Sequence, residues 1–192
     1  MRFLRGAYGR VIDLAGCERE GRFLESTGSL VLDHSARVAY AALSPRTDRS
    51  MAQHWADTLG FRLVPFTATD AQGMPYYHTN VMLFIGHGLA GVCLESIADP
   101  AERHEVEISL AESRLELLPI TREQVTRFCG NCLALSNDLG ERLFVMSTAA
   151  CEGFTPAQRS TLDTHGRLLH SDLSVFERLG GGSARCLLGE LF

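Results

Sequence analysis

The feature that most constrains this chain is an internal repeat with a period of 51 residues. Glycine or threonine recurs at that interval, at Gly28, Thr79, Gly130 and Gly181. A fixed period of this length is typical of proteins built from structural modules that stack on one another. The repeat predicts modules at about 28–78, 79–129 and 130–180, with 181–192 starting a further module.

The first three modules share one layout of short apolar segments. Two such segments flank a turn and indicate a hairpin, a helical stretch follows, and a third apolar segment ends the module. In the first module Met51, Trp55 and Leu59 lie at helical spacing before Gly60, and FRLVPF follows as a strand. In the third module we expect TPAQRSTLDTHG as the helix and VFERL as the last strand. The hairpin strands are expected at 29–33 and 37–43, 80–85 and 90–94, and 132–135 and 142–146.

Modules of two strands, a helix and a strand that repeat about an axis predict the α/β class and an α/β propeller of ββαβ units. Such a ring leaves no open strand edges when it is closed. Three modules and the stub at 181–192 do not close a ring, so we expect the completing modules, upstream of Met1, to be missing. Residues 1–192 are expected to form a single, partial domain.

Composition narrows the functional classes. A chain that is 45% apolar with a net charge of −5 can bury a sizeable core. Its lysines and arginines are scattered, which argues against a nucleic-acid partner. Residues 1–16 lack the continuous apolar stretch of a signal peptide or membrane helix, and six cysteines without a dense framework fit reduced thiols. We therefore expect a cytoplasmic protein with no membrane partner.

Polar residues recur close to the module starts. Glu25, His78 and Cys186 each lie within five residues of a repeat position, and equivalent positions of successive modules face the same end of a ring. Taken singly, these residues fit a solvated carboxylate, a hydrogen-bonded histidine and an inert buried thiol. Together, a thiol, an imidazole and a carboxylate are what nucleophilic catalysis requires. We expect the three side chains to converge in space.

The segment GGGSARC gives the strongest local indication of a site. Gly181 and Gly182 let the backbone approach a ligand closely or adopt a positive φ. Arg185 places a guanidinium beside the thiol of Cys186, which favours the thiolate. Cys186 is therefore the candidate nucleophile, and the two glycines are candidate ligand-binding positions.

Cys129 and Cys132 form a CxxC motif, which raises the possibility of a redox or zinc protein. A zinc site needs about four ligands, and a redox motif usually opens a helix after a strand. Here Cys132 starts an expected strand, no second CxxC exists, and the histidines lack ligand spacing with these thiols. We expect no metal and no organic cofactor, and the redox or zinc alternative predicts metal in the purified protein.

With these residues in hand, the chain resembles the amidinotransferase superfamily, the pentein-fold enzymes that include arginine deiminases. It is most similar to the arginine-deiminase-related group of citrulline-utilization hydrolases. The resemblance implies that Cys186 is the nucleophile, His78 the general acid and base, and Glu25 the carboxylate that positions His78. The matching segments, in chain order, are FLESTGSLVLDHSARVAYAALSPRTD, YHTNVMLFIG, CGNCLALSN, MSTAACEGFTPAQ and GGGSARCLLGELF.

The resemblance also implies an activity: hydrolysis of C–N bonds in a linear guanidino or ureido compound such as arginine or citrulline. The thiolate of Cys186 would attack the central carbon, and His78 would protonate the departing ammonia and then activate water against the covalent adduct. Asn80 stands where arginine deiminases carry an Asp that binds the guanidinium, and its neutral amide suits a ureido group. Arg185 resembles the family's candidate for binding the substrate carboxylate or holding the thiolate.

The chain departs from the family pattern at two points. Ser26 stands where close relatives have Gly, a change that a negative φ would tolerate. The family's N-terminal module, with its own substrate-binding residue, has no counterpart before Glu25. The alternatives are an amidinotransferase, in which an amine takes up the adduct, and an inactive truncated module that only folds or binds. Open strand edges favour association into a homo-oligomer.

Overall fold

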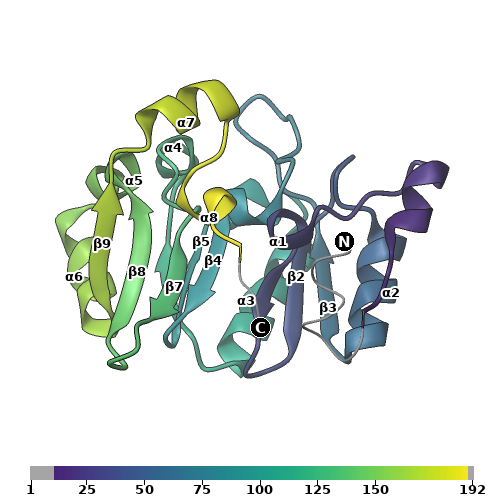
Figure 1. Cartoon of the computed structure of the whole chain (residues 1–192), viewed down its shortest axis with the longest axis horizontal. Coiled ribbons are helices and arrows are strands. Elements are labelled where there is room, and N and C mark those ends of the chain that lie inside the picture. The colour runs from purple at the N-terminus through teal and green to yellow at the C-terminus, as the bar shows by residue number, and fades with distance from the viewer. Residues whose placement is uncertain (1–10, 190–192) are drawn as a thin grey trace.

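The computed structural model describes residues 11–189, in which the strands form three separate three-stranded sheets (Figure 1). Each sheet follows chain order, and its middle strand pairs antiparallel with the first strand and parallel with the third. The strands are β1 (Val31–Asp33), β2 (Val38–Ala42), β3 (Arg62–Phe66), β4 (Leu83–Gly86), β5 (Leu89–Val92), β6 (Glu116–Pro119), β7 (Leu133–Ser136), β8 (Arg142–Ser147) and β9 (Arg167–Ser171).

A crossover helix joins the second and third strands of every sheet, as parallel pairing requires. These helices are α2 (Arg49–Leu59), α3 (Pro100–Glu112) and α6 (Pro156–His165), so each unit has the expected ββαβ order. The shorter helical elements are η2 (Ala15–Glu20), α1 (Ser26–Ser29), η3 (Thr79–Val81), η4 (Leu94–Ser96), α4 (Arg122–Thr126), α5 (Thr148–Gly153), α7 (Ser174–Gly180) and α8 (Ala184–Leu187).

Local sequence sets the ends of the crossover helices. Asp48 caps α2, because its Oδ1 accepts a hydrogen bond from the Met51 N–H at 2.9 Å. Gly60 ends the same helix with φ of 70°, a conformation in which a side chain is strained. Asp99 caps α3, and Thr155 opens α6 with a capping box. These caps satisfy backbone groups that the helices themselves leave unpaired.

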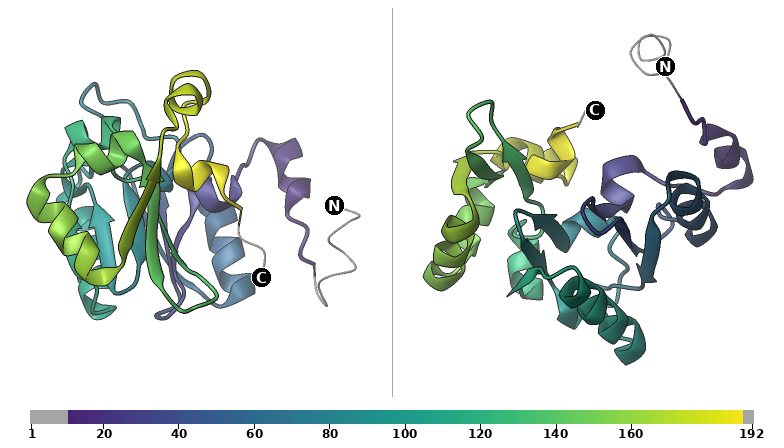
Figure 2. Two further views of the ribbon diagram at one scale, coloured as in Figure 1. Left: turned by 60° about the vertical axis from the view of Figure 1, so that its left-hand side comes forward. Right: turned by 90° about the horizontal axis from the view of Figure 1, so that it is seen from below.

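The three units lie along an arc, as the right-hand view of Figure 2 shows. The crossover helices α2, α3 and α6 lie on the outer side of the arc, and β4 contacts both β1 and β7. A cluster of buried residues continues across the units and includes Tyr40, Phe66, Phe84, Phe144 and Leu162. The α/β class and the small, repeated sheets are thereby confirmed, and closure into a propeller stays a prediction.

One predicted strand is wrong, and another begins later than predicted. VFERL lies in α7, where Val175, Phe176 and Leu179 are exposed. The strand that pairs parallel with β8 is β9, which follows directly after α6 and lies close to two repeat periods after β3. Asn80 belongs to η3 rather than to a strand, because hydrogen bonds such as the one from the Met82 N–H to the Thr79 carbonyl at 3.1 Å close a helical turn there.

Within residues 11–189 no helix has both the length and the apolar character needed to cross a membrane. Most of the N-terminal segment that we judged to lack a signal peptide, residues 1–10, lies outside the described part of the chain. The last three residues of the GGGSARCLLGELF segment also lie outside it.

Candidate active site

Glu25 and His78 form a carboxylate–imidazole pair that joins the start of the first module to the start of the second. Glu25 immediately precedes α1, His78 immediately precedes η3, and Glu25 Oε2 lies 2.8 Å from His78 Nε2. His78 is only 9% exposed. Burial, the larger effect, lowers the pKa of His78 below its usual value, and the hydrogen bond with Glu25 opposes that shift. The imidazole is therefore neutral at pH 7, with Nε2 oriented by the carboxylate.

Arg46 and Tyr77 complete the surroundings of this pair. Arg46 Nε donates to the same Glu25 oxygen at 2.6 Å, and hydrogen bonding to Arg46 is the main cause that lowers the pKa of Glu25. The Arg46 guanidinium lies 5.2 Å from the centre of the Tyr77 ring, which lies 5.0 Å from the His78 ring. Glu25 is thus held as an ionised carboxylate between a cation and the imidazole. Sequence analysis had not singled out Arg46 or Tyr77.

Gly28 provides the space that His78 occupies. A Cβ at Gly28 would lie 2.5 Å from His78 Nδ1, closer than atoms can approach. At the next repeat position, the buried Thr79 hydroxyl donates to the Ser29 carbonyl at 2.5 Å and accepts from the Ala42 N–H at 2.7 Å. These repeat positions therefore lie where the second module packs closely against the first.

Cys186 lies on α8, exposed to solvent, and contacts the second and third modules. Asn131 Nδ2 donates a hydrogen bond to Cys186 Sγ at 3.3 Å, and Sγ lies 3.9 Å from Asn80 Oδ1. Burial and, to a smaller extent, the nearby charge of Cys186 raise the pKa of Tyr77. The structure thus brings Cys186 to the segment that contains His78, although no hydrogen bond joins these two residues among residues 11–189.

Asn80 and Asn131 are buried amides at equivalent positions of successive modules. Each is 2% exposed. Asn80 Nδ2 donates to the Thr27 carbonyl at 3.2 Å, and Asn131 Nδ2 donates to the Asn80 carbonyl at 2.9 Å across a separation of 51 residues. Sequence analysis had treated Asn131 only as part of the CGNC motif. Its position, one repeat period after Asn80, is the sequence signal that could have identified it.

The remaining predicted site residues lie in the segment before Cys186. The Arg185 N–H donates to Asn131 Oδ1 at 3.1 Å. Gly181 ends α7 with φ of 68°, and its carbonyl accepts a hydrogen bond from the Tyr77 hydroxyl at 2.6 Å. A Cβ at Gly182 would lie 3.0 Å from the Cys186 Cβ, so a side chain there would crowd the thiol.

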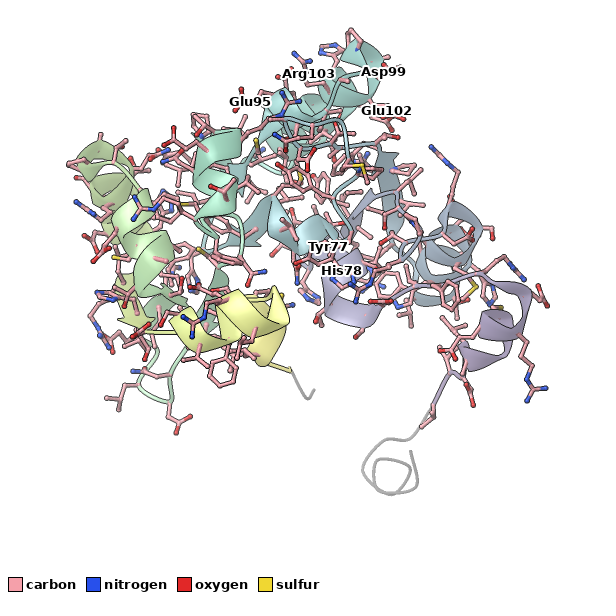
Figure 3. The ribbon with its side chains drawn as sticks, turned by 90° about the horizontal axis from the view of Figure 1, so that it is seen from above. Tyr77, His78, Glu95, Asp99, Glu102 and Arg103 are labelled. Carbon is pink, nitrogen blue, oxygen red and sulfur yellow. The ribbon has the colours of Figure 1, made fainter. Side chains whose placement is uncertain are left out.

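Figure 3 shows how these elements meet. Tyr77 and His78 lie beside the ribbon of α1, whereas the other four labelled residues lie toward the outer edge of the molecule. Beside the pair, Ser26 has φ of 48°, so the negative φ that would tolerate serine in place of glycine is not what the structure has. Ser26 therefore adopts a backbone conformation that favours glycine.

The cysteines of the CGNC motif have a different environment from that of Cys186. Cys129 and Cys132 are buried, and their thiols donate to the carbonyls of Ala150 and Cys129. Burial raises the pKa of Cys129 to about 12 and that of Cys132 well above its usual value. Such thiols are poor nucleophiles. No group of three or more His, Cys, Asp or Glu side chains suited to a metal is found within the described residues.

A hollow of about 770 Å³ runs along the inner strands β1, β4 and β7. Its lining includes Thr27, Asn80 and Arg185, so one part of it reaches the segments around the candidate site. Glu25, His78 and Cys186 do not line it. The candidate site is therefore defined by its hydrogen-bonded side chains and not by this hollow.

Repeated ββαβ units with a carboxylate–imidazole pair near an exposed thiol are the features of the pentein class of α/β proteins, and the comparisons agree. The chain belongs to the family described as "N,N dimethylarginine dimethylhydrolase, eukaryotic", whose model matches residues 4–192. The expected membership of the amidinotransferase, or pentein, superfamily is thereby confirmed. Comparison with curated proteins gives no significant match.

Solved structures with this fold include three informative examples. AgrE in complex with ornithine and NAD+ has a TM-score of 0.74 at 18% identity, over 97% of this chain and 24% of AgrE. The N-terminal domain of ArgZ, a cyanobacterial arginine dihydrolase, has 0.65 at 16% identity over 83% of this chain and 54% of the domain in a substrate-bound mutant. Dimethylargininase (DDAH) from Pseudomonas aeruginosa, complexed with citrulline, has 0.52 at 15% identity over 83% of this chain and 55% of that one. At these identities the likeness shows the fold alone, and the chain spans about half the length of the last two structures.

Proposed function

We propose that this chain carries the catalytic groups of a hydrolase that cleaves a C–N bond in a linear guanidino or ureido compound through a covalent adduct on Cys186. The observation that carries the proposal is the Glu25–His78 pair, with His78 two residues before Asn80, whose Oδ1 lies 3.9 Å from Sγ of the exposed Cys186. Family membership supports the substrate class, because the family's own name denotes hydrolysis of a methylated arginine.

In the first half of the proposed reaction, the sulfur of Cys186 forms a bond to the central carbon of the substrate. A guanidino carbon is a poor electrophile, so a strong sulfur nucleophile is needed. His78 takes up the thiol proton of Cys186 as the C–S bond forms, then donates a proton to the departing nitrogen while the C–N bond breaks, and ammonia or an amine leaves. Because Glu25 occupies Nε2, Nδ1 is the His78 nitrogen that exchanges protons with the reactants.

In the second half, His78 accepts a proton from water, and the resulting hydroxide attacks the same carbon. The C–S bond breaks and Cys186 leaves as the thiolate. A neutral His78 suits this step, because burial lowers its pKa and leaves the imidazole free to act as a base at pH 7. Glu25 stabilises the imidazolium that forms, and Arg46 keeps Glu25 ionised.

Asn80, Arg185, Gly181 and Gly182 are proposed as the substrate-binding positions. The Asn80 side chain lies against Cys186 Sγ, where the reacting carbon would be held. Its neutral amide offers both an acceptor and donors, which suits a ureido group. Gly181 and Gly182 leave room for a ligand beside the thiol, since neither carries a side chain.

The proposal is tested by measuring release of ammonia and dimethylamine from arginine, citrulline, agmatine and N,N-dimethylarginine. Cys186→Ser should reduce turnover by more than about a thousandfold, because the nucleophile is lost. Cys17→Ser, at a partly exposed thiol outside the site, should leave turnover unchanged. Retained turnover in Cys186→Ser would overturn the proposal.

The same assay separates the alternatives. An amidinotransferase would need an added amine acceptor for product formation, whereas a hydrolase would not. A folded wild-type chain that releases no amine from any of the four compounds would favour an inactive module that only folds or binds.

A further inference from the structure

We infer that Asn131 is a positioning residue for Cys186: its side-chain amide orients the sulfur and stabilises it as the thiolate. The inference rests on the proposed function for its catalytic meaning. The contacts that carry it do not depend on which substrate is bound. These contacts are hydrogen bonds made by both the oxygen and the nitrogen of the buried Asn131 side-chain amide.

The orientation of the Asn131 amide is fixed by its other partners. Oδ1 accepts the hydrogen bond from the Arg185 N–H at 3.1 Å, so this atom must be the oxygen. One hydrogen of Nδ2 then goes to the Asn80 carbonyl at 2.9 Å, and the other faces Cys186 Sγ at 3.3 Å. The amide is 2% exposed, so water cannot replace these contacts cheaply.

The two asparagines around the sulfur differ in which protonation state they favour. Asn80 Nδ2 donates to the Thr27 carbonyl, so Asn80 presents Oδ1 to Cys186 and can only accept a hydrogen bond from the thiol. Asn131 presents a donor, which is the favourable partner of a sulfur anion. The thiol can therefore hydrogen-bond to Asn80, and the thiolate can hydrogen-bond to Asn131.

The place of Asn131 in the repeat explains why it can do this. Asn131 stands one residue after Gly130, as Asn80 stands one residue after Thr79. A Cβ at Gly130 would lie 2.2 Å from the Val81 carbonyl oxygen, so the third module packs closely against the second at this point. This close packing brings the Asn131 side-chain amide, which belongs to the third module, within hydrogen-bond distance of the Asn80 backbone and of Cys186 on α8.

The test follows alkylation of Cys186 by iodoacetamide between about pH 5 and pH 10, quantified on the peptide that contains it. The variants are Asn131→Asp, which turns the donor into a carboxylate, and Asn131→Ser, which shortens it without adding charge. Asn137→Asp on the exposed β7–β8 turn is the matched control. The other charged or titratable groups around the sulfur, namely His78 with its partner Glu25, Arg46, Tyr77 and Arg185, are unchanged in all variants.

The inference predicts that the pH midpoint of alkylation rises by about one unit or more in Asn131→Asp. Asn131→Ser should show a smaller rise, and Asn137→Asp should match wild type. The buried Cys93 should stay unreactive in every folded variant. If Asn131→Asp does not fold, the pH midpoint of alkylation in Asn131→Ser serves as the test of the inference. Profiles of folded Asn131 variants that superimpose on wild type would overturn the inference.

This readout needs no turnover, so its failure can be told from failure of the proposed function. A shifted alkylation profile in a chain that releases no amine would support the role of Asn131 and count against the hydrolase. Amine release that depends on Cys186, with an alkylation profile insensitive to Asn131, would support the hydrolase and overturn the inference.

Discussion

At the scale of single residues, Gly28 determines where His78 can lie. The imidazole occupies the volume that a Cβ at this position would fill. The backbone of α1 therefore supports the ring, while Glu25 at the start of the same helix holds Nε2. One short helix thus provides both the hydrogen-bond partner of His78 and the surface against which it packs.

Gly28→Ala should accordingly displace His78 and reduce turnover by more than about tenfold, because a small misplacement of a catalytic group is costly. The overpacking should also lower the free energy of unfolding by about 1–3 kcal/mol. Gly16→Ala is the control, since a Cβ there meets nothing within 4 Å. Steady-state assays and thermal melts report the two effects. Wild-type turnover in Gly28→Ala would contradict the close packing described for His78.

Prediction of the site from sequence depended on the repeat. Phase alone pointed to Glu25 and His78, which are in direct contact, and to Cys186, which lies by Asn80. Arg46 was not predictable in this way, because it approaches Glu25 from a loop after β2 and has no equivalent repeat position. The backbone of Ser26 was also beyond sequence analysis, since its positive φ depends on how α1 packs.

At the scale of elements, a histidine network joins the second and third units at the ends of their strands. His165 at the end of α6 bonds Glu116 Oε2 of β6 at 2.8 Å and the His87 carbonyl at 2.9 Å. His87 Nε2 in turn lies 3.0 Å from the Leu135 carbonyl of β7. The hydrogen bond with Glu116 is the main cause that raises the pKa of His165. The network therefore links the two units most strongly when His165 is protonated.

Glu116→Gln should make this link less sensitive to pH. A raised pKa in the folded state means that the ion pair stabilises the protein below the unfolded value of 6.5, and that its contribution is lost as pH rises through the folded value. Glu116 is exposed and His165 is partly exposed, so solvent screens the pair and the effect should stay below about 1 kcal/mol. Glu116→Gln should lower the melting temperature by about 1–3 °C at pH 5.5 and by less at pH 8.5.

Glu105→Gln, an exposed position on α3, makes the same change of charge and serves as the control. It should leave the pH dependence of the melting temperature as in wild type. Equal losses of stability in Glu116→Gln at both pH values would show that protonation of His165 does not govern this contact.

Elements with strong end signals were predictable from sequence, and those without were not. Helix α2 begins after a capping Asp48 and ends at Gly60, as its spacing predicts. VFERL has the apolar residues of a strand. However, the chain already rejoins the sheet directly after the crossover helix α6, as β9, and VFERL follows later in α7. Which segment pairs with β8 depends on tertiary contacts, so apolar content alone could not identify β9 as the strand.

At the scale of the whole molecule, the repeat brings equivalent ends of successive units together. Glu25, His78 and Asn131 lie next to the starts of successive modules, and hydrogen bonds at these starts connect all three modules from Ser29 to Cys186. The fold class and the ββαβ order were predictable because each unit repeats the same order of apolar segments, turn and helical stretch. The contacts between modules were not, since they depend on atoms brought close only by stacking.

The central claim is that Cys186 attacks the substrate and carries it as a covalent adduct. The most direct measurement is rapid acid quenching during turnover of a substrate labelled at its central carbon, followed by mass analysis of the Cys186 peptide. The account predicts labelled Cys186 that forms before amine release is complete and decays as product appears, with no label in Cys186→Ser. Steady amine release from a chain whose Cys186 stays unlabelled at every quench time would contradict it.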